Sequence, residues 1–290
     1  MRGIILAGGS GSRLYPATKA LNKHLLPVYD KPLIYYSLST LMLAGIRDIA
    51  VVTSPNTKSA MAELLGDGSQ FGVSLTFVVQ PEPLGLSDGL FRCKEFLNDQ
   101  SFLMILGDNL FFSAGLTGLL SKLTEQDSDK VTSVVTVAVK DPQRFGVVES
   151  DSSGRVVSIV EKPAKPTSNR IVTGLYRFPS DAPNRVDSLV PSARGELEVT
   201  DLLNSYIQDG SSFEALSLPR GAVWFDAGTT ESMYQASEFV KTYQEASGCL
   251  IGCPEEIAMT NRWIESEHLL SQLSGAQSDS PYARYVKRVG

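Results

Sequence analysis

The chain has 290 residues, 42% of them hydrophobic and 20% charged, which suits a soluble α/β protein and excludes a fibrous or disordered one. Its formal net charge of −6 argues against a broad positively charged surface for nucleic acid or anionic lipid. Any anion must therefore be bound by a local cluster of positively charged groups. The apolar stretch Ile4 to Ala7 is too short for a signal peptide, and no run is long enough to span a membrane. We therefore expect a cytoplasmic protein.

The cysteines and histidines predict neither disulfides nor a zinc site. Cys93, Cys249 and Cys253 cannot all pair, and His24 and His268 are far apart in the sequence. We expect the three thiols to lie in the core.

The first part of the chain alternates between strands and helices. A buried strand, Gly3 to Ala7, precedes a glycine-rich loop, and a helix is expected over Leu33 to Leu43. The alternation continues to residue 123 and predicts a mainly parallel sheet. The further expected strands are Arg47 to Ser54, Ser74 to Val79 and Ser101 to Asp108, and the further expected helices are Thr57 to Leu65, Leu86 to Leu97 and Leu116 to Leu123.

The second part begins with strands whose short turns favour antiparallel pairing. These strands are expected over Val131 to Val139, Gly146 to Glu149, Val156 to Glu161 and Ile171 to Phe178. After them we expect a helix at Asp201 to Gln208, strands at Glu214 to Leu218 and Ala222 to Phe225 that return to the sheet, and helices at Ser232 to Ala246 and Glu255 to Leu273.

The loop GGSGSRLYP, residues 8 to 16, favours phosphate binding, because successive glycines turn backbone N–H groups toward one point before a helix N-terminus. The alternative is a tight strand-to-helix turn. No Gly-Lys occurs in the chain, which excludes the triphosphate P-loop, and Leu14 stands where the dinucleotide fingerprint needs its third glycine. A dehydrogenase is therefore a weak alternative.

Arg13 in this loop and Lys23 ten residues later supply two cations beside the glycines. The segment GGSGSRLYPATKALNKHLLPVYDKP resembles the signature GGxGTRLxP, followed by a lysine and LLPV, of the sugar-nucleotide pyrophosphorylases. Ser12 replaces the usual threonine and keeps its hydroxyl.

Further segments resemble the glucose-1-phosphate thymidylyltransferase branch of that family in order and spacing. They are LGDN at 106–109, FGVVE at 145–149, EKP at 161–163, VTGLY at 172–176, SARGELEVTDL at 192–202 and CPEEIA at 253–258. The resemblance implies a Rossmann-like nucleotide-diphospho-sugar transferase fold with an antiparallel sugar-binding insertion. Residues 1–240 would form the core, with a nucleotide-binding half (1–120) and a sugar-binding half (121–240), and 241–290 a helical segment for oligomer and regulatory contacts.

The resemblance implies attack of glucose 1-phosphate on the α-phosphorus of dTTP, giving dTDP-glucose and pyrophosphate. A phosphate monoester is already a nucleophile at pH 7, so catalysis consists of aligning two anions and neutralising charge. Arg13 would hold the triphosphate, Lys23 the phosphates near the reacting centre and Lys162 the sugar phosphate. Asp108 and Asp226, which both end apolar strands, would hold Mg²⁺.

The resemblance also implies the binding residues. The nucleotide would contact Leu6, Gly8, Gly9, Gly11, Ser12, Gln80 and Gly85, and the sugar Asn109, Gly146, Glu161, Val172, Gly174 and Glu196. The base loop departs from the usual QPxPxGLAQAF at Leu84, Ser87, Asp88 and Gly89, so the carboxylate of Asp88 could alter base or ribose preference.

The carboxyl-terminal third resembles the family segment for subunit contact and nucleotide feedback, which implies a homotetramer built as a dimer of dimers. Arg220, Glu255 and Glu256 match the family, whereas Ala114 and Thr260 replace a histidine and an arginine, which argues against intact regulation. The alternatives are use of UTP or another hexose phosphate, and a catalytically silent regulatory homologue.

Overall fold

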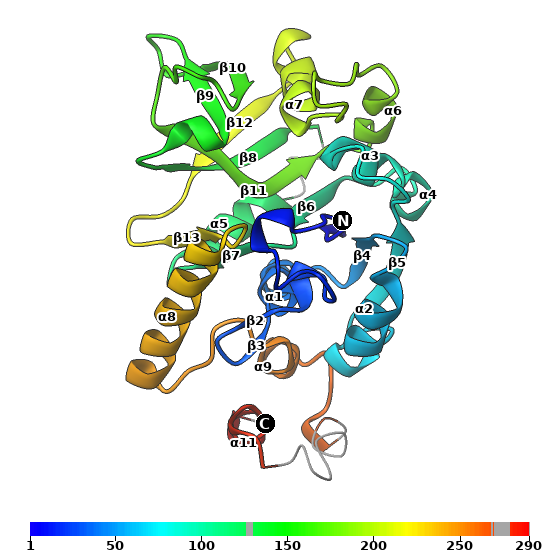
Figure 1. The fold of residues 1–290 in the computed structure, drawn as a ribbon, viewed down its shortest axis with the longest axis vertical. Helices are drawn as coiled ribbons and strands as arrows, with labels where there is room; N and C mark the ends of the chain where they lie inside the picture. Colours follow the sequence, from blue (N-terminus) through cyan, green and yellow to red (C-terminus); the bar gives the residue numbers. More distant parts are fainter. Residues whose placement is uncertain (126–129, 268, 270–278, 290) are drawn as a thin grey trace.

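A nine-stranded sheet forms the centre of the structure, a computed structural model that describes residues 1–125, 130–267, 269 and 279–289 (Figure 1). Its strand order is β10-β9-β11-β6-β1-β4-β5, with β8 added on β11 and β12 on β8. The strands are β1 (Arg2–Leu6), β4 (Asp48–Thr53), β5 (Ser74–Val79), β6 (Phe102–Leu106), β8 (Thr132–Ala138), β9 (Gly146–Ser150), β10 (Val156–Glu161), β11 (Arg170–Phe178) and β12 (Phe213–Ser217).

The sheet has a parallel part and an antiparallel part. Strands β5, β4, β1 and β6 are parallel neighbours, and β12 is parallel to β8. Strand β11 runs antiparallel to β6, β8 and β9, and β9 pairs with β10 in the same way. The predicted fold class, a mainly parallel sheet flanked by helices with an antiparallel insertion, is confirmed.

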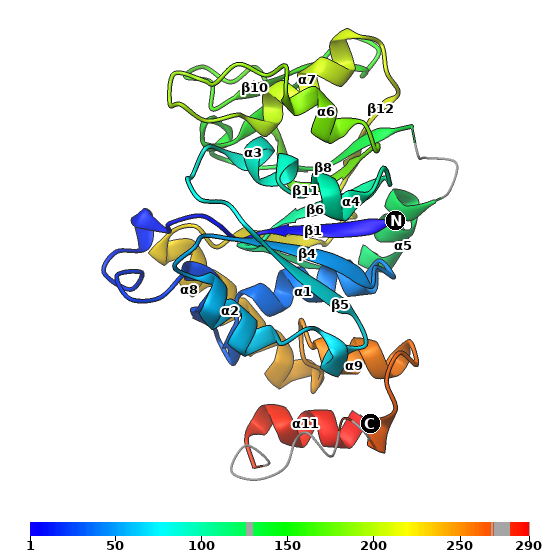
Figure 2. The ribbon, with the colours of Figure 1, turned by 90° about the vertical axis from the view of Figure 1, so that its right-hand side faces the viewer.

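Side chains of β1 alternate between two cores because successive residues of a strand point to opposite faces. Ile5, and Ala7 directly after the strand, join one buried cluster, and Ile4 and Leu6 join the other. Figure 2 shows α1 on one side of β1 and α3 and α4 on the other. The first cluster includes residues of α1 (Ile34–Leu43), α2 (Lys58–Leu65) and α5 (Leu116–Thr124), and the second those of α3 (Leu86–Phe91), α4 (Lys94–Leu97), α6 (Ala182–Val186) and α7 (Val199–Gln208).

Two short strands form a separate antiparallel pair beside the main sheet. They are β7 (Asn109–Phe112) and β13 (Val223–Asp226), in a register that sets Asp226 opposite Asn109. The expectation that residues 222–225 return to the main sheet is therefore wrong. The sequence analysis predicted no strand at β7. Only two residues, Gly107 and Asp108, separate β7 from β6, so the sequence pattern did not show a second strand there. A second small sheet pairs β2 (Pro27–Val28) with β3 (Lys31–Pro32).

The carboxyl-terminal segment begins with α8 (Thr230–Ser247), whose N-terminus carries a capping box of Thr229 and Ser232. The expected helix over residues 255–273 is shorter: α9 (Pro254–Thr260) ends where Arg262 adopts φ +57°, a conformation outside the α-helix. Residues 268 and 270–273 of that expectation lie outside the described residues. A further helix, α11 (Pro281–Val289), was not predicted.

Three smaller expectations are also settled by the structure. The helix expected over 86–97 is divided into α3 and α4 at Arg92 and Cys93. Cys93 and Cys253 are buried as expected, but Cys249 is exposed. Within the described residues, no helix combines the length and the apolar character needed to cross a membrane.

Candidate active site

The glycine-rich loop lies at the carboxyl end of β1, where parallel strands commonly present ligand sites. Gly11 has φ +64°, which a glycine adopts without strain, and precedes a three-residue 3₁₀ helix, Ser12–Leu14. The expected helix N-terminus is absent from this loop, because Pro16 cannot continue a hydrogen-bonded helix, and α1 begins only at Ile34. Positive charge at the loop therefore comes from Arg13 and Lys23 rather than from a helix dipole.

Lys23 contacts the carboxylate that follows β6. Its ammonium donates a hydrogen bond to Asp108 and forms an ion pair with it. Burial acts to raise the pKa of Asp108, but the charge of Lys23 and hydrogen bonds from Lys23 and Asn109 outweigh burial and hold that pKa well below its usual range. His24 is buried and its pKa is lowered to about 3, chiefly by burial and then by Lys23, so its ring is neutral at pH 7.

Asp226 lies next to Asp108 because β13 pairs with β7. The backbone N–H of Ala227 donates to the Asp108 carbonyl at 3.0 Å. Burial and then the charge of Asp108 raise the pKa of Asp226, although Lys23, Arg13 and Arg144 act against this. An ideal Cβ on Gly228 would lie 2.8 Å from Oδ1 of Asp226 and 3.0 Å from Nη2 of Arg13, so the arginine and the carboxylate are close neighbours.

The two aspartates fit a divalent cation. Two adjacent carboxylates, one with a raised pKa, are electrostatically disfavoured together, and a cation between them removes that repulsion. In the part of the chain that the structure describes, no group of three or more His, Cys, Asp or Glu side chains could enclose a metal ion. Two carboxylates completed by phosphate oxygens and water are the arrangement that Mg²⁺ prefers over an all-protein cage.

A cavity of about 590 Å³ opens beside these carboxylates and is lined by most of the predicted catalytic and sugar-binding residues. The predicted residues that line it are Ser12, Arg13, Asp108, Asn109, Gly146, Glu161, Lys162, Val172, Gly174, Glu196 and Asp226. Lys23 and Gly11 are not among its lining residues. Gly11 lies beside Lys23, since a Cβ on Gly11 would be 3.1 Å from the Lys23 Cβ.

Asn109 fixes one wall of this cavity. Its Oδ1 accepts hydrogen bonds from the Gly174 N–H at 3.1 Å and from Nε1 of Trp224 at 2.6 Å, and its Nδ2 donates to Asp108 at 3.0 Å. A Cβ on Gly174 would lie 2.6 Å from Cγ of Leu106 and 2.8 Å from Cγ of Asn109, so no side chain fits there. The amide and the glycine together hold β7, β11 and β13 in register around the site.

A cluster of charged side chains lies where the predicted sugar contacts Glu161 and Glu196 line the cavity. Nζ of Lys162 lies 2.8 Å from Oε1 of Glu161, and Lys162 itself has φ +41°, a strained conformation of the kind found at functional sites. Nη2 of Arg194 lies 2.8 and 2.9 Å from the two oxygens of Glu198, 3.3 Å from Glu196 and 3.5 Å from Glu161. The Arg194 guanidinium thus forms ion pairs with three carboxylates.

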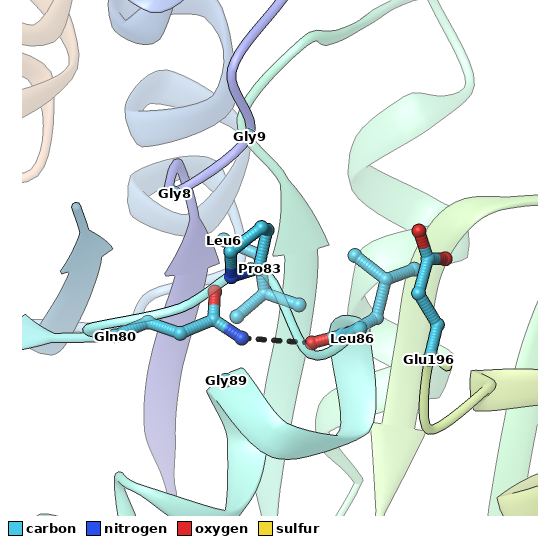
Figure 3. A pocket seen from close by; sticks show the side chains of 9 residues that line it. Leu6, Gly8, Gly9, Gln80, Pro83, Leu86, Gly89 and Glu196 are labelled. Atoms are coloured by element: carbon cyan, nitrogen blue, oxygen red, sulfur yellow. Dashed lines mark hydrogen bonds between the residues drawn. The ribbon is translucent and has the colours of Figure 1, made fainter. Parts of the chain in front are cut away.

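A smaller cavity of about 160 Å³ adjoins the first, since Leu86 and Glu196 line both (Figure 3). Its walls are mainly apolar. The predicted nucleotide-binding residues that line it are Leu6, Gly8, Gly9, Gln80 and Gly85. Glu196, predicted as a sugar contact, stands on the side of the cavity opposite Gln80.

Several lining residues of the larger cavity were missed by sequence reasoning. They are Arg144, Phe145, Tyr176, Arg194, Glu198, Thr200 and Trp224. Most of them stand inside or beside the motifs on which the family resemblance rests, so their proximity to a motif could have identified them as candidate site residues. Trp224 has no such signal, because it stands in none of these motifs. Arg144 directly precedes FGVVE, but its approach to Asp226 depends on the fold.

The residues expected for regulation do not all line one cavity. Glu256 and Thr260 line a separate cavity of about 430 Å³ with residues of α1, β7 and α9, whereas Ala114 and Arg220 are not among its lining residues. Glu255 is buried and accepts a hydrogen bond from the Tyr282 hydroxyl. Loss of feedback regulation stays a prediction.

Comparisons with known proteins agree with this geometry. The model of the family described as nucleotidyl transferase matches residues 2–243. The chain is 46% identical to a glucose-1-phosphate thymidylyltransferase of Neisseria meningitidis over 100% of this chain and 99% of that one. It is 41% identical to one of Mycobacterium tuberculosis over 99% and 98% of the two chains.

Solved structures share the fold. A Bacillus anthracis protein described as a glucose-1-phosphate thymidylyltransferase, crystallised with sucrose, has a TM-score of 0.76 and 38% identity, covering 82% of this chain and 94% of that one. A UDP-glucose pyrophosphorylase complexed with UDP-glucose has a TM-score of 0.72 at 24% identity, covering 84% and 98%, and this likeness concerns the fold alone.

Proposed function

Since the chain belongs to the nucleotidyl transferase family and, within it, to the glucose-1-phosphate thymidylyltransferases, we propose that it transfers a thymidylyl group from dTTP to glucose 1-phosphate. The products are dTDP-glucose and pyrophosphate. The observation that carries this proposal is the larger cavity, in which Arg13 and Lys162 line the walls together with the adjacent carboxylates Asp108 and Asp226.

The chemistry that this cavity suits is the joining of two anions. An oxygen of the sugar phosphate attacks the α-phosphorus, and the bond from that phosphorus to the bridging oxygen breaks, so that the electron pair leaves with pyrophosphate. The sugar phosphate dianion needs no general base, which agrees with a site rich in cations. Each cation about 4 Å from a phosphate charge contributes on the order of 4 kcal/mol at an effective dielectric near 20.

The roles of the cations follow from their positions. Arg13, on the glycine-rich loop beside Asp226, is suited to the triphosphate and the departing pyrophosphate. Lys23, paired with Asp108, is suited to the phosphates at the reacting centre. Lys162 is suited to the sugar phosphate, because it follows β10 and lines the same cavity beside Glu161. Glu161 beside it can accept hydrogen bonds from sugar hydroxyls.

Mg²⁺ would be held by Asp108 and Asp226, and when bound it would neutralise negative charge that develops on the phosphates. The protein's own part is to hold both carboxylates on paired strands with Lys23 and Arg13 beside them. Dialysis against EDTA should abolish turnover, and added Mg²⁺ should restore it. Full turnover by metal-free protein would contradict this assignment.

A nucleotide panel tests the proposed reaction. Purified protein is incubated with Mg²⁺, glucose 1-phosphate and one of dTTP, UTP, CTP, ATP or GTP, and pyrophosphate is measured. We expect the highest kcat/KM with dTTP. If none of the five triphosphates yields pyrophosphate, the result would favour a silent regulatory homologue. A preference for UTP would remove the thymidylyl assignment. Galactose 1-phosphate in place of glucose 1-phosphate tests the choice of hexose.

The homotetramer and the cytoplasmic location stay predictions from the family resemblance. Light scattering coupled to gel filtration tests the first, and cell fractionation the second.

A further inference from the structure

Both hydrogens of the Gln80 side-chain amide are engaged within the protein. Gln80 directly follows β5 and is 9% exposed. Its Nε2 donates to the carbonyl of Gly85 at 2.9 Å and to Oδ2 of Asp88 at 2.8 Å. A carbonyl and a carboxylate are both acceptors, so turning the amide over would set its oxygen against two other oxygens. The two contacts therefore fix which way the amide points.

The Oε1 atom of Gln80 consequently points to the other side, toward Gly8 and the smaller cavity (Figure 3). An ideal Cβ on Gly8 would lie 2.9 Å from this oxygen, which measures how close the loop comes to it. A ligand in the cavity meets Gln80 as a hydrogen-bond acceptor alone.

Asp88 supplies one of the two acceptors that fix this orientation. It lies in the first turn of α3, is 6% exposed and is not among the residues that line the cavity. Its Oδ2 also accepts from Nε of Arg92 at 3.0 Å, so the carboxylate itself is held in place. The sequence suggested that Asp88 could alter base or ribose preference, and the structure puts it behind Gln80, outside the lining of the smaller cavity.

We propose that Asp88 is a positioning residue for base selection. It holds Gln80 so that only Oε1 faces the base, and the site thereby selects a nucleoside triphosphate whose base presents an N–H donor there, such as N3–H of thymine or uracil. Cytosine has a lone pair at N3, which would face the Gln80 oxygen without a proton between them. This inference rests on the proposed function, because it takes the base to bind beside Gln80.

The test compares kcat/KM for dTTP and CTP in the native protein, Asp88→Ala and Asp88→Asn. Alanine removes one of the two acceptors, so a turned amide would set its oxygen against the Gly85 carbonyl alone and could donate to cytosine N3. Asparagine keeps an acceptor oxygen that Gln80 and Arg92 can both share. We expect Asp88→Ala to raise the CTP to dTTP ratio of kcat/KM about tenfold and Asp88→Asn to change it less than about twofold.

The change should appear in KM rather than in kcat, since the base lies away from the reacting phosphorus and contributes binding in the ground and transition states alike. Asp181→Ala is the matched control. Asp181 also accepts from an arginine four residues later, Nε of Arg185 at 2.8 Å, and from a neutral donor, the Tyr206 hydroxyl at 2.7 Å, but is not among the residues lining the cavity. Its loss should lower the melting temperature and leave the nucleotide ratio unchanged.

The outcomes separate the inference from the proposed function. An unchanged ratio in Asp88→Ala, or an equal change in Asp88→Asn and Asp88→Ala, overturns the role of Asp88. If the native protein releases no pyrophosphate with dTTP, the proposed function fails. Calorimetric titration of the same variants with dTTP and CTP then still tests base selection, and equal binding of both nucleotides by the native protein overturns it.

Discussion

Lys23 and Asp108 form an ion pair across 85 residues of sequence, with 12% of each side chain exposed. The pair links the segment that follows the glycine-rich loop to the end of β6, the parallel neighbour of β1 in the sheet. It brings the Lys23 cation to one of the two carboxylates that are suited to metal.

Asp108→Asn should lower kcat at least about 100-fold, because the near-isosteric amide loses the charge that pairs with Lys23 and binds metal. The free energy of unfolding should fall by about 1–3 kcal/mol, since Lys23 loses its partner in a largely buried place. Steady-state kinetics and denaturant unfolding measure the two effects. Native turnover in a folded variant would refute the role of Asp108.

Asp226→Asn should abolish turnover yet stabilise the protein at about pH 8. The pKa of Asp226 is raised above its ordinary value of 3.8 by burial and by Asp108, so the charged carboxylate costs folding free energy at high pH. We expect a gain of about 1 kcal/mol, or about 2–4 °C in melting temperature. The gain should shrink as the pH falls through the raised pKa, because Asp226 is then protonated in the native protein.

The sign of this pH dependence is the decisive measurement. A variant that is less stable than the native protein at about pH 8, or a gain that grows toward acid pH, would contradict the electrostatic account of Asp226.

Gly174→Ala should destabilise the protein by about 1–3 kcal/mol and raise KM for glucose 1-phosphate, because the new Cβ would overlap Leu106 and Asn109. Gly118→Ala is the control. Gly118 is exposed in α5 with nothing within 4 Å of an added Cβ, so alanine should stabilise the helix by about 0.5–1 kcal/mol. Thermal melts and initial rates compare the two, and equal effects would remove the packing argument.

Arg194→Ala should raise KM for glucose 1-phosphate about tenfold or more. Without the guanidinium, Glu196 and Glu198 would lose their ion-pair partner, and Glu161 would keep only Lys162, so negative charge would increase at the end of the cavity that Lys162 lines. KM for dTTP should change much less, since Arg194 does not line the smaller cavity. If both KM values rise equally, Arg194 acts on the whole site rather than on the sugar phosphate.

The order of strands and helices was legible in the sequence because short runs rich in β-branched and other apolar residues, bounded by turn residues, indicate strands. Strands β5 and β10 begin and end at the predicted residues. The glycine-rich loop with Arg13 and Lys23, and the polar ends of apolar strands at Asp108 and Asp226, marked the candidate site by local chemistry and family resemblance. The helix expected over residues 33–43 matches α1, but the same local signals placed a helix N-terminus at the loop, where the structure has a three-residue 3₁₀ helix. They also overextended the helix that begins near residue 254.

Tertiary structure alone decided how these residues meet. The pairing of β7 with β13 sets Asp226 opposite Asn109, and a four-residue strand carries no pattern that names its partner. The place of Arg144 beside Asp226, the three carboxylates around Arg194 and the position of Asp88 behind Gln80 depend on contacts between segments that local sequence preferences do not encode. A residue's chemistry is set by its side chain, but its partners are set by the packing of the whole chain.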